Sequence, residues 1–256
     1  MKIAVCVKHV PEQARRLDPE TKRLDRSGEG AINPFDVHAV EEALRIKDRV
    51  GGEVVIVSMG PAAAQNSIRK ALAMGADSAL LISDDAAAGS DLVATVNTLA
   101  AALEREGADL ILFGQQAGDS DGAVLWAAVA DRLRLPVISQ VAELQVENGK
   151  VRGKRQTEFG YDVIEAPTPA VLAVSDAINE PRYPSLKGIM GARSKPQRTI
   201  SLAELGLAGD GVGEAGSRTV VHALSDPPPR GESLKIEDDG AAADKIVEFL
   251  TERKLL

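Results

Sequence analysis

Short apolar runs alternate with helical apolar stripes through the first half of the chain. The runs are brief and rich in Val, Ile and Leu, as buried strands are. They cover Ile3–Val7, Val54–Val57, Ala79–Ile82 and Leu110–Phe113. Between them, apolar residues recur three or four positions apart, which is typical of a helix packed on one side. These stripes comprise Val37, Val40 and Leu44, then Ile68, Leu72 and Met74, then Leu92, Val93, Val96, Leu99 and Leu103. The alternation predicts βαβ units around a parallel sheet, and so an α/β fold.

The pattern changes after Pro136. Two strand-like stretches, Val137–Val146 and Val151–Glu158, flank Asn148-Gly149, a pair typical of a tight hairpin turn. Ala170–Val174 is a further strand candidate. We therefore expect a hairpin to follow the parallel units.

The last part of the chain is interpreted as a linker and a helical arm. A Gly-rich connector is followed by Asp226–Arg230, whose three prolines predict a stiff, extended spacer. A helix of about Ala241–Lys254 ends the chain, and its apolar stripe must be covered either by its own domain or by a partner subunit. The core then spans residues 1–200, including a loop at 174–196, and the linker and arm span 201–256.

Composition supports the α/β prediction and argues against one class of function. Aromatic residues make up only 3% of the chain, so the core is built from aliphatic side chains, as in a parallel sheet under Ala-rich helices. The net charge is −8, which argues against nucleic acid as a partner.

The single cysteine and the N-terminal residues indicate in which cellular compartment the protein is expected. Cys6 is the only cysteine, which excludes a disulfide framework and a cysteine-cluster metal site, and a lone reduced thiol fits the cytoplasm. The first apolar run is too short for a signal peptide, and no stretch approaches the ~18 apolar residues of a membrane span. We expect a cytoplasmic protein with no metal and no membrane insertion.

A loop of small and polar residues, Phe113 to Ala123, lies between a predicted strand and an apolar helix. Backbone N–H groups in such a loop can approach a ligand, and a helix N-terminus favours phosphate oxygens. Asp119 and Asp121 could accept from ribose hydroxyls or could only cap the helix. The loop matches neither a Walker A nor a GxGxxG pattern, so nucleotide binding and an ordinary connection both stay open.

The end of the first strand should lie at the same edge of the sheet as this loop. Residues Asn33–Asp36 begin the next helix, with Asn33 as a candidate cap and Pro34 in the first helical position. Met59, after the second strand, would line the same crevice. Cys6 stands between two valines and is expected to be a small buried hydrophobe rather than a nucleophile.

Residues 176–196 combine prolines and basic residues with Leu186, Ile189 and Met190. A cationic, partly apolar segment on an acidic protein suits a docking surface. A solvated loop whose apolar residues fold back onto the core is the alternative, and the sequence leaves both open.

Together these stretches resemble the electron transfer flavoprotein beta-subunit family, including its FixA-like bacterial members. The resemblance covers essentially the whole chain. The similar stretches are Val5-Cys6-Val7-Lys8, Asn33-Pro34-Phe35-Asp36, Ala39-Val40-Glu41-Glu42-Ala43, Met59-Gly60-Pro61-Ala62, Ala71-Leu72-Ala73-Met74-Gly75-Ala76-Asp77, the 114–125 loop and Asn179-Glu180-Pro181-Arg182-Tyr183.

The resemblance implies an adenine nucleotide alpha hydrolase-like, Rossmann-like core and an alpha subunit that carries a redox-active FAD. It implies AMP in this subunit. Electrons would pass from acyl-CoA-type dehydrogenases through that FAD to a quinone-linked oxidoreductase, as in fatty acid oxidation. This chain would then be part of an electron carrier and would hold no catalytic side chain. The implied nucleotide contacts are Cys6, Asn33, Pro34, Phe35, Asp36, Met59, Gly114, Gln115, Gln116, Ala117, Gly118, Asp119, Ser120, Asp121, Gly122, Ala123, Val124 and Leu125.

The resemblance also places partner recognition at about Val174–Pro196. Leu186 would be the anchor that dehydrogenases hold. Tyr183, Ile189 and Met190 would accompany it, and the tail helix would embrace the alpha subunit. Asp162 stands where the family often has a Glu that restrains the swinging flavin domain, and an Asp is shorter.

One departure bears on the nucleotide. Electron-bifurcating relatives bind a second FAD here and typically show Asp-Gly-Asp-Thr-Ala-Gln, whereas this chain has Gly122 and Val124 in place of the Thr and Gln. Losing two hydrogen-bonding side chains weakens polar contact by roughly 1 kcal/mol each. AMP is therefore favoured over FAD. A bifurcating subunit that oxidises NADH and a stand-alone nucleotide-binding protein are the alternatives.

Overall fold

The computed structural model describes residues 1–12, 17–26, 29–229 and 235–256. The chain divides into two compact units, Met1–Val221 and His222–Leu256. The first contains the sheet and its helices. The second contains α6 (Ala242–Glu252), which corresponds to the predicted tail helix.

Among the described residues, nine strands form one sheet, in the order β11-β5-β4-β1-β6-β10-β7-β8-β9. The strands are β1 (Lys2–Cys6), β4 (Glu53–Met59), β5 (Ser78–Ile82), β6 (Leu110–Gly114), β7 (Val137–Glu147), β8 (Lys150–Thr157), β9 (Gly160–Pro167), β10 (Ala170–Val174) and β11 (Gln197–Ile200). Pairing is parallel from β11 through to β7 and antiparallel from β7 to β9. A small antiparallel pair, β2 (His9–Pro11) and β3 (Gly30–Ile32), stands apart from this sheet. The predicted α/β fold is confirmed.

The hairpin predicted around Asn148-Gly149 joins β7 to β8. Both turn residues have positive φ, 51° and 75°, which is the geometry that an Asn-Gly pair adopts most easily. The sequence pattern did not indicate β9 or β11.

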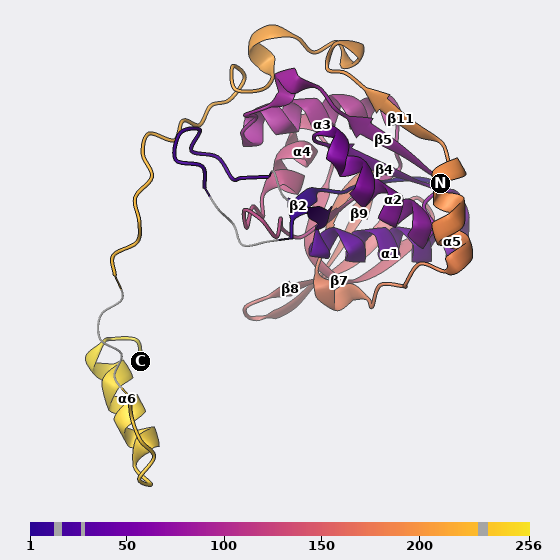
Figure 1. The fold of residues 1–256 in the computed structure, drawn as a ribbon. Coiled ribbons are helices and arrows are strands. Elements are labelled where there is room, and N and C mark those ends of the chain that lie inside the picture. Colours follow the sequence, from indigo (N-terminus) through magenta and orange to yellow (C-terminus); the bar gives the residue numbers. More distant parts are fainter. Residues whose placement is uncertain (13–16, 27–28, 230–234) are drawn as a thin grey trace. The chain divides into compact units, whose positions relative to one another are not determined.

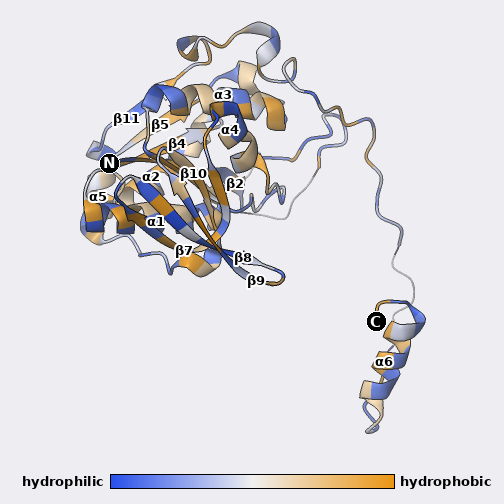
Figure 2. Ribbon diagram, turned by 180° about the vertical axis from the view of Figure 1, so that it is seen from behind, coloured by the Kyte–Doolittle hydropathy of each residue, from blue (hydrophilic) through white to orange (hydrophobic). Residues whose placement is uncertain are grey.

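Helices cover both faces of the sheet (Figure 1). Helices α1 (Pro34–Val50) and α2 (Gln65–Met74) pack on one face, while α3 (Leu92–Glu106) and α4 (Leu125–Leu133) pack on the other. Successive strand residues point to opposite faces, so Ile3 and Val5 join the α1–α2 core while Ala4 and Cys6 join the α3–α4 core. Because both faces are buried, the central strands β1, β4, β5, β6 and β10 are largely apolar, as the hydropathy colouring in Figure 2 shows.

Two short segments complete the first unit. Helix α5 (Leu186–Gly191) lies beside α2 (Figure 1). Residues after β11 also belong here, since Leu202 and Val212 are buried in the α3–α4 core. Single 3₁₀ turns lie at Ala62–Ala64, Asp85–Ala87, Asp176–Ile178, Ala192–Ser194, Ala203–Leu205 and Gly209–Gly211.

The predicted proline spacer is only partly described. Asp226–Pro229 has no regular secondary structure, and Arg230 lies outside the described residues. Within the described ranges, none of the helices combines the length and the apolarity that crossing a membrane requires.

The sheet has a topological switch point at β1. From β1 the chain builds β4 and β5 on one side, then crosses back to place β6 on the other side of β1. In open α/β sheets, ligands bind outside the carboxyl ends of the strands at such a point. The loops that follow β1 and β6 are therefore the first place to look for a site.

Candidate functional site

The switch-point site comprises Lys8, Arg26, residues 33–36, Met59 and residues 114–125. It lies where β1, β4 and β6 end, and the structure joins the 33–36 turn directly to the 114–125 loop. Most of the predicted nucleotide residues therefore come together at one edge of the sheet.

Asn33 ties the β6–α4 loop to the start of α1. Its side chain is 1% exposed. Its Nδ2 donates to the Gln116 carbonyl at 2.9 Å, and its Oδ1 accepts from the Gly118 N–H at 2.9 Å. Asn33 occupies the N-cap position of α1 as expected, but its side chain makes no cap hydrogen bond because the neighbouring loop already uses both of its polar atoms.

Gly114 lets β6 approach the first turn of α1 closely. A Cβ atom here would lie 2.6 Å from Asp36 Oδ1 and 2.6 Å from the Phe35 carbonyl carbon, so only glycine fits. The buried Asp36 carboxylate accepts from the Lys8 N–H at 2.7 Å. Burial raises the pKa of Asp36 to about 7, although hydrogen bonds from the Lys8 and Gly114 N–H groups oppose the rise.

Asp119 is the anionic centre of the loop. It is 5% exposed, and it pairs with Lys8 Nζ at 2.7 Å and with an Arg26 terminal nitrogen at 2.6 Å. Burial alone would raise the pKa of Asp119, but the two cations outweigh it and hold the pKa below its usual value. The N-cap of α4 is Val124, so neither aspartate of the loop occupies the cap position.

The far end of the loop offers backbone donors. The Ala117 N–H donates to the Gly122 carbonyl, which closes the loop on itself. Within the described part of the chain, the N–H groups of residues 122–126 have no acceptor. They stand at the N-terminus of α4, where the helix dipole also favours negative charge. With Lys8 and Arg26 in the same site, this donor set suits the phosphate of a nucleotide.

Cys6 and Met59 are the last residues of β1 and β4, which end at the site. Cys6 ends β1 and faces the α3–α4 core. Burial, with a smaller contribution from the Asp36 charge, raises the pKa of the Cys6 thiol well above its ordinary value. The thiol is therefore protonated and packs as a small apolar group, and Met59 lies half-buried against the same core.

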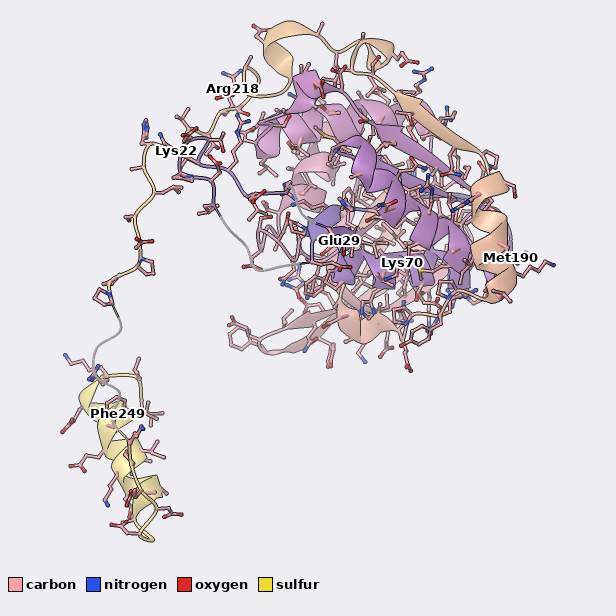
Figure 3. The ribbon with its side chains drawn as sticks, in the orientation of Figure 1. Lys22, Glu29, Lys70, Met190, Arg218 and Phe249 are labelled. Carbon is pink, nitrogen blue, oxygen red and sulfur yellow. The ribbon has the colours of Figure 1, made fainter. Side chains whose placement is uncertain are left out.

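The predicted recognition residues gather on and before α5. Tyr183 is 93% exposed, Leu186 75%, Met190 74% and Ile189 55%. Figure 3 shows Met190 on the outer side of α5. These side chains do not fold back onto the core, which removes the alternative of a loop with its apolar residues covered by its own unit.

Asp162 joins neither region. It lies on β9, where its carboxylate is 3.4 Å from an Arg155 nitrogen and largely exposed. The strand order puts β10, β7 and β8 between β6 and this strand. A hollow of about 430 Å³ between α3 and α4, lined in part by Glu104 and Arg132, also shares no residue with the switch-point site.

Sequence reasoning placed the end of the first strand, with Lys8, at this edge of the sheet, but named neither Lys8 nor Arg26 as a nucleotide contact. For Arg26 the available signal was the long polar connection from residue 11 to residue 32, since loops of this length are more often functional than accidental. Its residues 13–16 and 27–28 lie outside the described part of the chain.

The fold and this site define an α/β protein with a loop rich in backbone donors at its switch point and an exposed apolar surface on α5. The electron transfer flavoprotein domain matches residues 21–205. The electron transfer flavoprotein subunit beta of Thermoanaerobacterium thermosaccharolyticum is 40% identical over 260 residues, covering 100% of both chains. That of Mycobacterium bovis is 37% identical over 263 residues, covering 99% of both. A caffeyl-CoA reductase-Etf complex subunit, CarD, of Acetobacterium woodii is 38% identical over 262 residues, covering 100% of both. The chain belongs to the electron transfer flavoprotein beta-subunit family.

Proposed function

We propose that this chain is the beta subunit of a heterodimeric electron transfer flavoprotein that works in the cytoplasm. It binds AMP at the switch-point site and docks dehydrogenases of the acyl-CoA type through α5. The alpha subunit carries the FAD that passes electrons on to a quinone-linked oxidoreductase. The docking role rests on one observation: Leu186, Ile189 and Met190 on α5 are exposed.

AMP suits the donors that the chain offers. The phosphate would accept from the N–H groups of residues 122–126, with Lys8 and Arg26 supplying positive charge. Bound AMP supplies no redox chemistry and serves as a structural ligand. Since FAD contains an AMP moiety, the choice depends on contacts beyond the phosphate, and Gly122 and Val124 bring no side-chain hydrogen bond to it.

Nucleotide content tests this part of the proposal. The chain is co-expressed with its alpha subunit, the complex is denatured, and the released FAD and AMP are quantified by chromatography. We expect one FAD and one AMP per heterodimer. Two FAD and no AMP would overturn the AMP assignment.

A bifurcating subunit is the second candidate, because one relative is named as part of a caffeyl-CoA reductase complex. In that role this site would hold FAD and the complex would oxidise NADH. Two FAD per heterodimer together with NADH-driven reduction would establish it. A chain that binds nucleotide but forms no complex with an alpha subunit would instead be a stand-alone nucleotide-binding protein.

Leu186→Ala tests docking directly. Burying a leucine in a partner contributes about 1.5–3 kcal/mol. The KM for the flavoprotein in dehydrogenase-driven reduction should therefore rise about 10- to 100-fold. Leu17→Ala is the matched control, since Leu17 is also exposed, at 56%, but lies outside the docking surface. Equal KM values for Leu186→Ala and the wild type would refute the docking role.

A further inference from the structure

The segment just before the exposed helix is bound to α1 through backbone and side-chain polar groups of Asn179, Glu180 and Arg182. The Asn179 carbonyl contacts His38 Nδ1 at 3.0 Å, and the Asn179 side-chain amide donates to the His38 carbonyl at 3.1 Å and to Glu42 Oε2 at 3.2 Å. The Glu180 carbonyl accepts from an Arg45 terminal nitrogen at 3.2 Å. Residues 179–182 therefore lie along α1 as a fixed strap.

Glu41 is the centre of this contact. It is 3% exposed, and Arg182 reaches it three times, through its backbone N–H at 3.1 Å, its Nε at 2.8 Å and a terminal nitrogen at 3.3 Å. Arg45 Nε donates to the same carboxylate at 2.8 Å. Burial alone would raise the pKa of Glu41, but the bonds from Arg182 and Arg45 win and hold it below its usual value. The carboxylate is therefore ionised, and removing a partner leaves a buried charge undercompensated.

The exposed helix is itself capped at its start and fixed on α2. Ser185 caps α5 by accepting from the Gly188 N–H at 3.0 Å. A Cβ on Gly188 would lie 2.3 Å from the Ala73 carbonyl oxygen, so α5 rests directly on the backbone of α2. Lys195 Nζ donates to the Leu72 and Ala76 carbonyls at 2.8 and 2.6 Å. The segment from Tyr183 to Met190 thus stands between two anchors, while the side chains of Tyr183, Leu186, Ile189 and Met190 are exposed.

We propose that Arg182 and Glu41 are positioning residues for docking. Their ion pair holds residues 183–190 in the geometry that a partner meets, and so lowers the ordering cost at the moment of binding. The inference rests on the proposed docking function. Arg182 would act by positioning Leu186 and its neighbours, and it would make no contact with the partner's redox group.

Arg182 suits this task better than a lysine would. Its fork binds Glu41 through two nitrogens and also reaches Asp48 at 3.0 Å. A lysine carries the charge but lacks this planar, preorganised geometry. A protein with lysine at position 182 should therefore dock differently from the wild type, although the charge at this position is the same.

The experiment compares Arg182→Gln and Arg182→Lys in the full heterodimer. Arg182→Gln leaves Glu41 paired with Arg45, so we expect the fold to be retained at a reduced stability. Arg152→Gln is the control, because it removes one exposed positive charge on β8, away from the strap. The measurements are amide hydrogen exchange of residues 183–191 and the KM and kcat of dehydrogenase-driven reduction.

For Arg182→Gln we expect faster exchange of residues 183–191 and a KM raised about 5- to 10-fold with kcat within twofold of the wild type. Arg182→Lys should recover part of both effects, and Arg152→Gln should match the wild type. Wild-type exchange and KM in Arg182→Gln, with Leu186→Ala still impaired, would overturn the positioning role and leave docking intact. A fall in kcat at unchanged KM would also overturn it. If Leu186→Ala itself behaves as wild type, the docking function fails and the inference with it.

Discussion

The switch-point site and the docking segment, residues 179–196, share one helix but are built in opposite ways. At the start of α1, Asn33 and Asp36 are buried and turn their polar atoms inward to hold a loop. Midway along α1, Glu41 holds a strap whose continuation turns Leu186 outward. Under the proposed function, a small ligand would meet fixed polar atoms, whereas a protein partner would meet uncovered apolar side chains on a fixed backbone. Substitutions in the first region should therefore act on folding and nucleotide binding, and those of the exposed apolar side chains in the second on docking alone.

The largest expected effect is that of Gly114→Ala. The added methyl meets backbone atoms at 2.6 Å, which cannot move aside as a flexible side chain could. We expect the free energy of unfolding to fall by about 3 kcal/mol, with loss of bound nucleotide. Urea unfolding and nucleotide analysis of the purified protein measure both.

Gly122→Ala is the control for that comparison. It lies in the same loop, but its Cβ would meet nothing nearer than Ser120 Oγ at 3.6 Å, an ordinary contact. Its stability should match that of the wild type. Equal stability of Gly114→Ala and Gly122→Ala would show that close packing of β6 on α1 does not hold the site together.

A somewhat smaller effect is expected from the pH dependence of Asp36. Its folded-state pKa is raised to about 7, so its contribution to stability is present at low pH and is lost as pH rises towards 7. Between pH 5 and pH 8 the loss amounts to about 2–3 kcal/mol, at about 1.4 kcal/mol per pKa unit.

Asp36→Asn isolates this effect because an asparagine does not titrate. Relative to the wild type, the variant should gain stability as pH rises from 5 to 8 and then level off. Unfolding free energies at three pH values suffice. A constant difference between the two proteins would mean that Asp36 is already ionised in the fold at pH 5.

The smallest effect on folding is expected from Met190→Ala. Its side chain is 74% exposed, so the free energy of unfolding should change by less than about 0.5 kcal/mol. Nucleotide content should be unchanged while the KM for dehydrogenase-driven reduction rises. Thermal unfolding measures the stability, and the kinetics of dehydrogenase-driven reduction measure the KM. A large loss of stability would contradict the contrast between the two regions.

The sequence predicted the parts of the fold that carry a strong apolar pattern. Strands β1, β4, β5, β6 and β10 are continuous buried runs, and each was expected. The edge strands β9 and β11 were missed because their side chains are mostly exposed and show no such run. Edge strands form through pairing with a neighbour, which local pattern does not reveal.

The site was predictable to the same degree. Residues at the carboxyl ends of strands could be grouped because parallel strands end at one edge. The contact of Lys8 with Asp119 spans 111 positions, and that of Glu41 with Arg182 spans 141. Such pairs depend on how loops close over the finished sheet, and the sequence has many other lysines, arginines and acids that could have paired instead.

The separation of Glu41 from Arg182 also sets an order of events during synthesis and folding. Contacts across 141 positions form late, because the intervening chain must first be brought together. We expect the strap to settle on α1 after β10 has joined β6, since β10 ends at Val174 and a single 3₁₀ turn, Asp176–Ile178, separates it from the strap. In that order of events, a half-folded chain would present a loose segment in place of α5. Maturation of the sheet thus comes before competence to meet a partner.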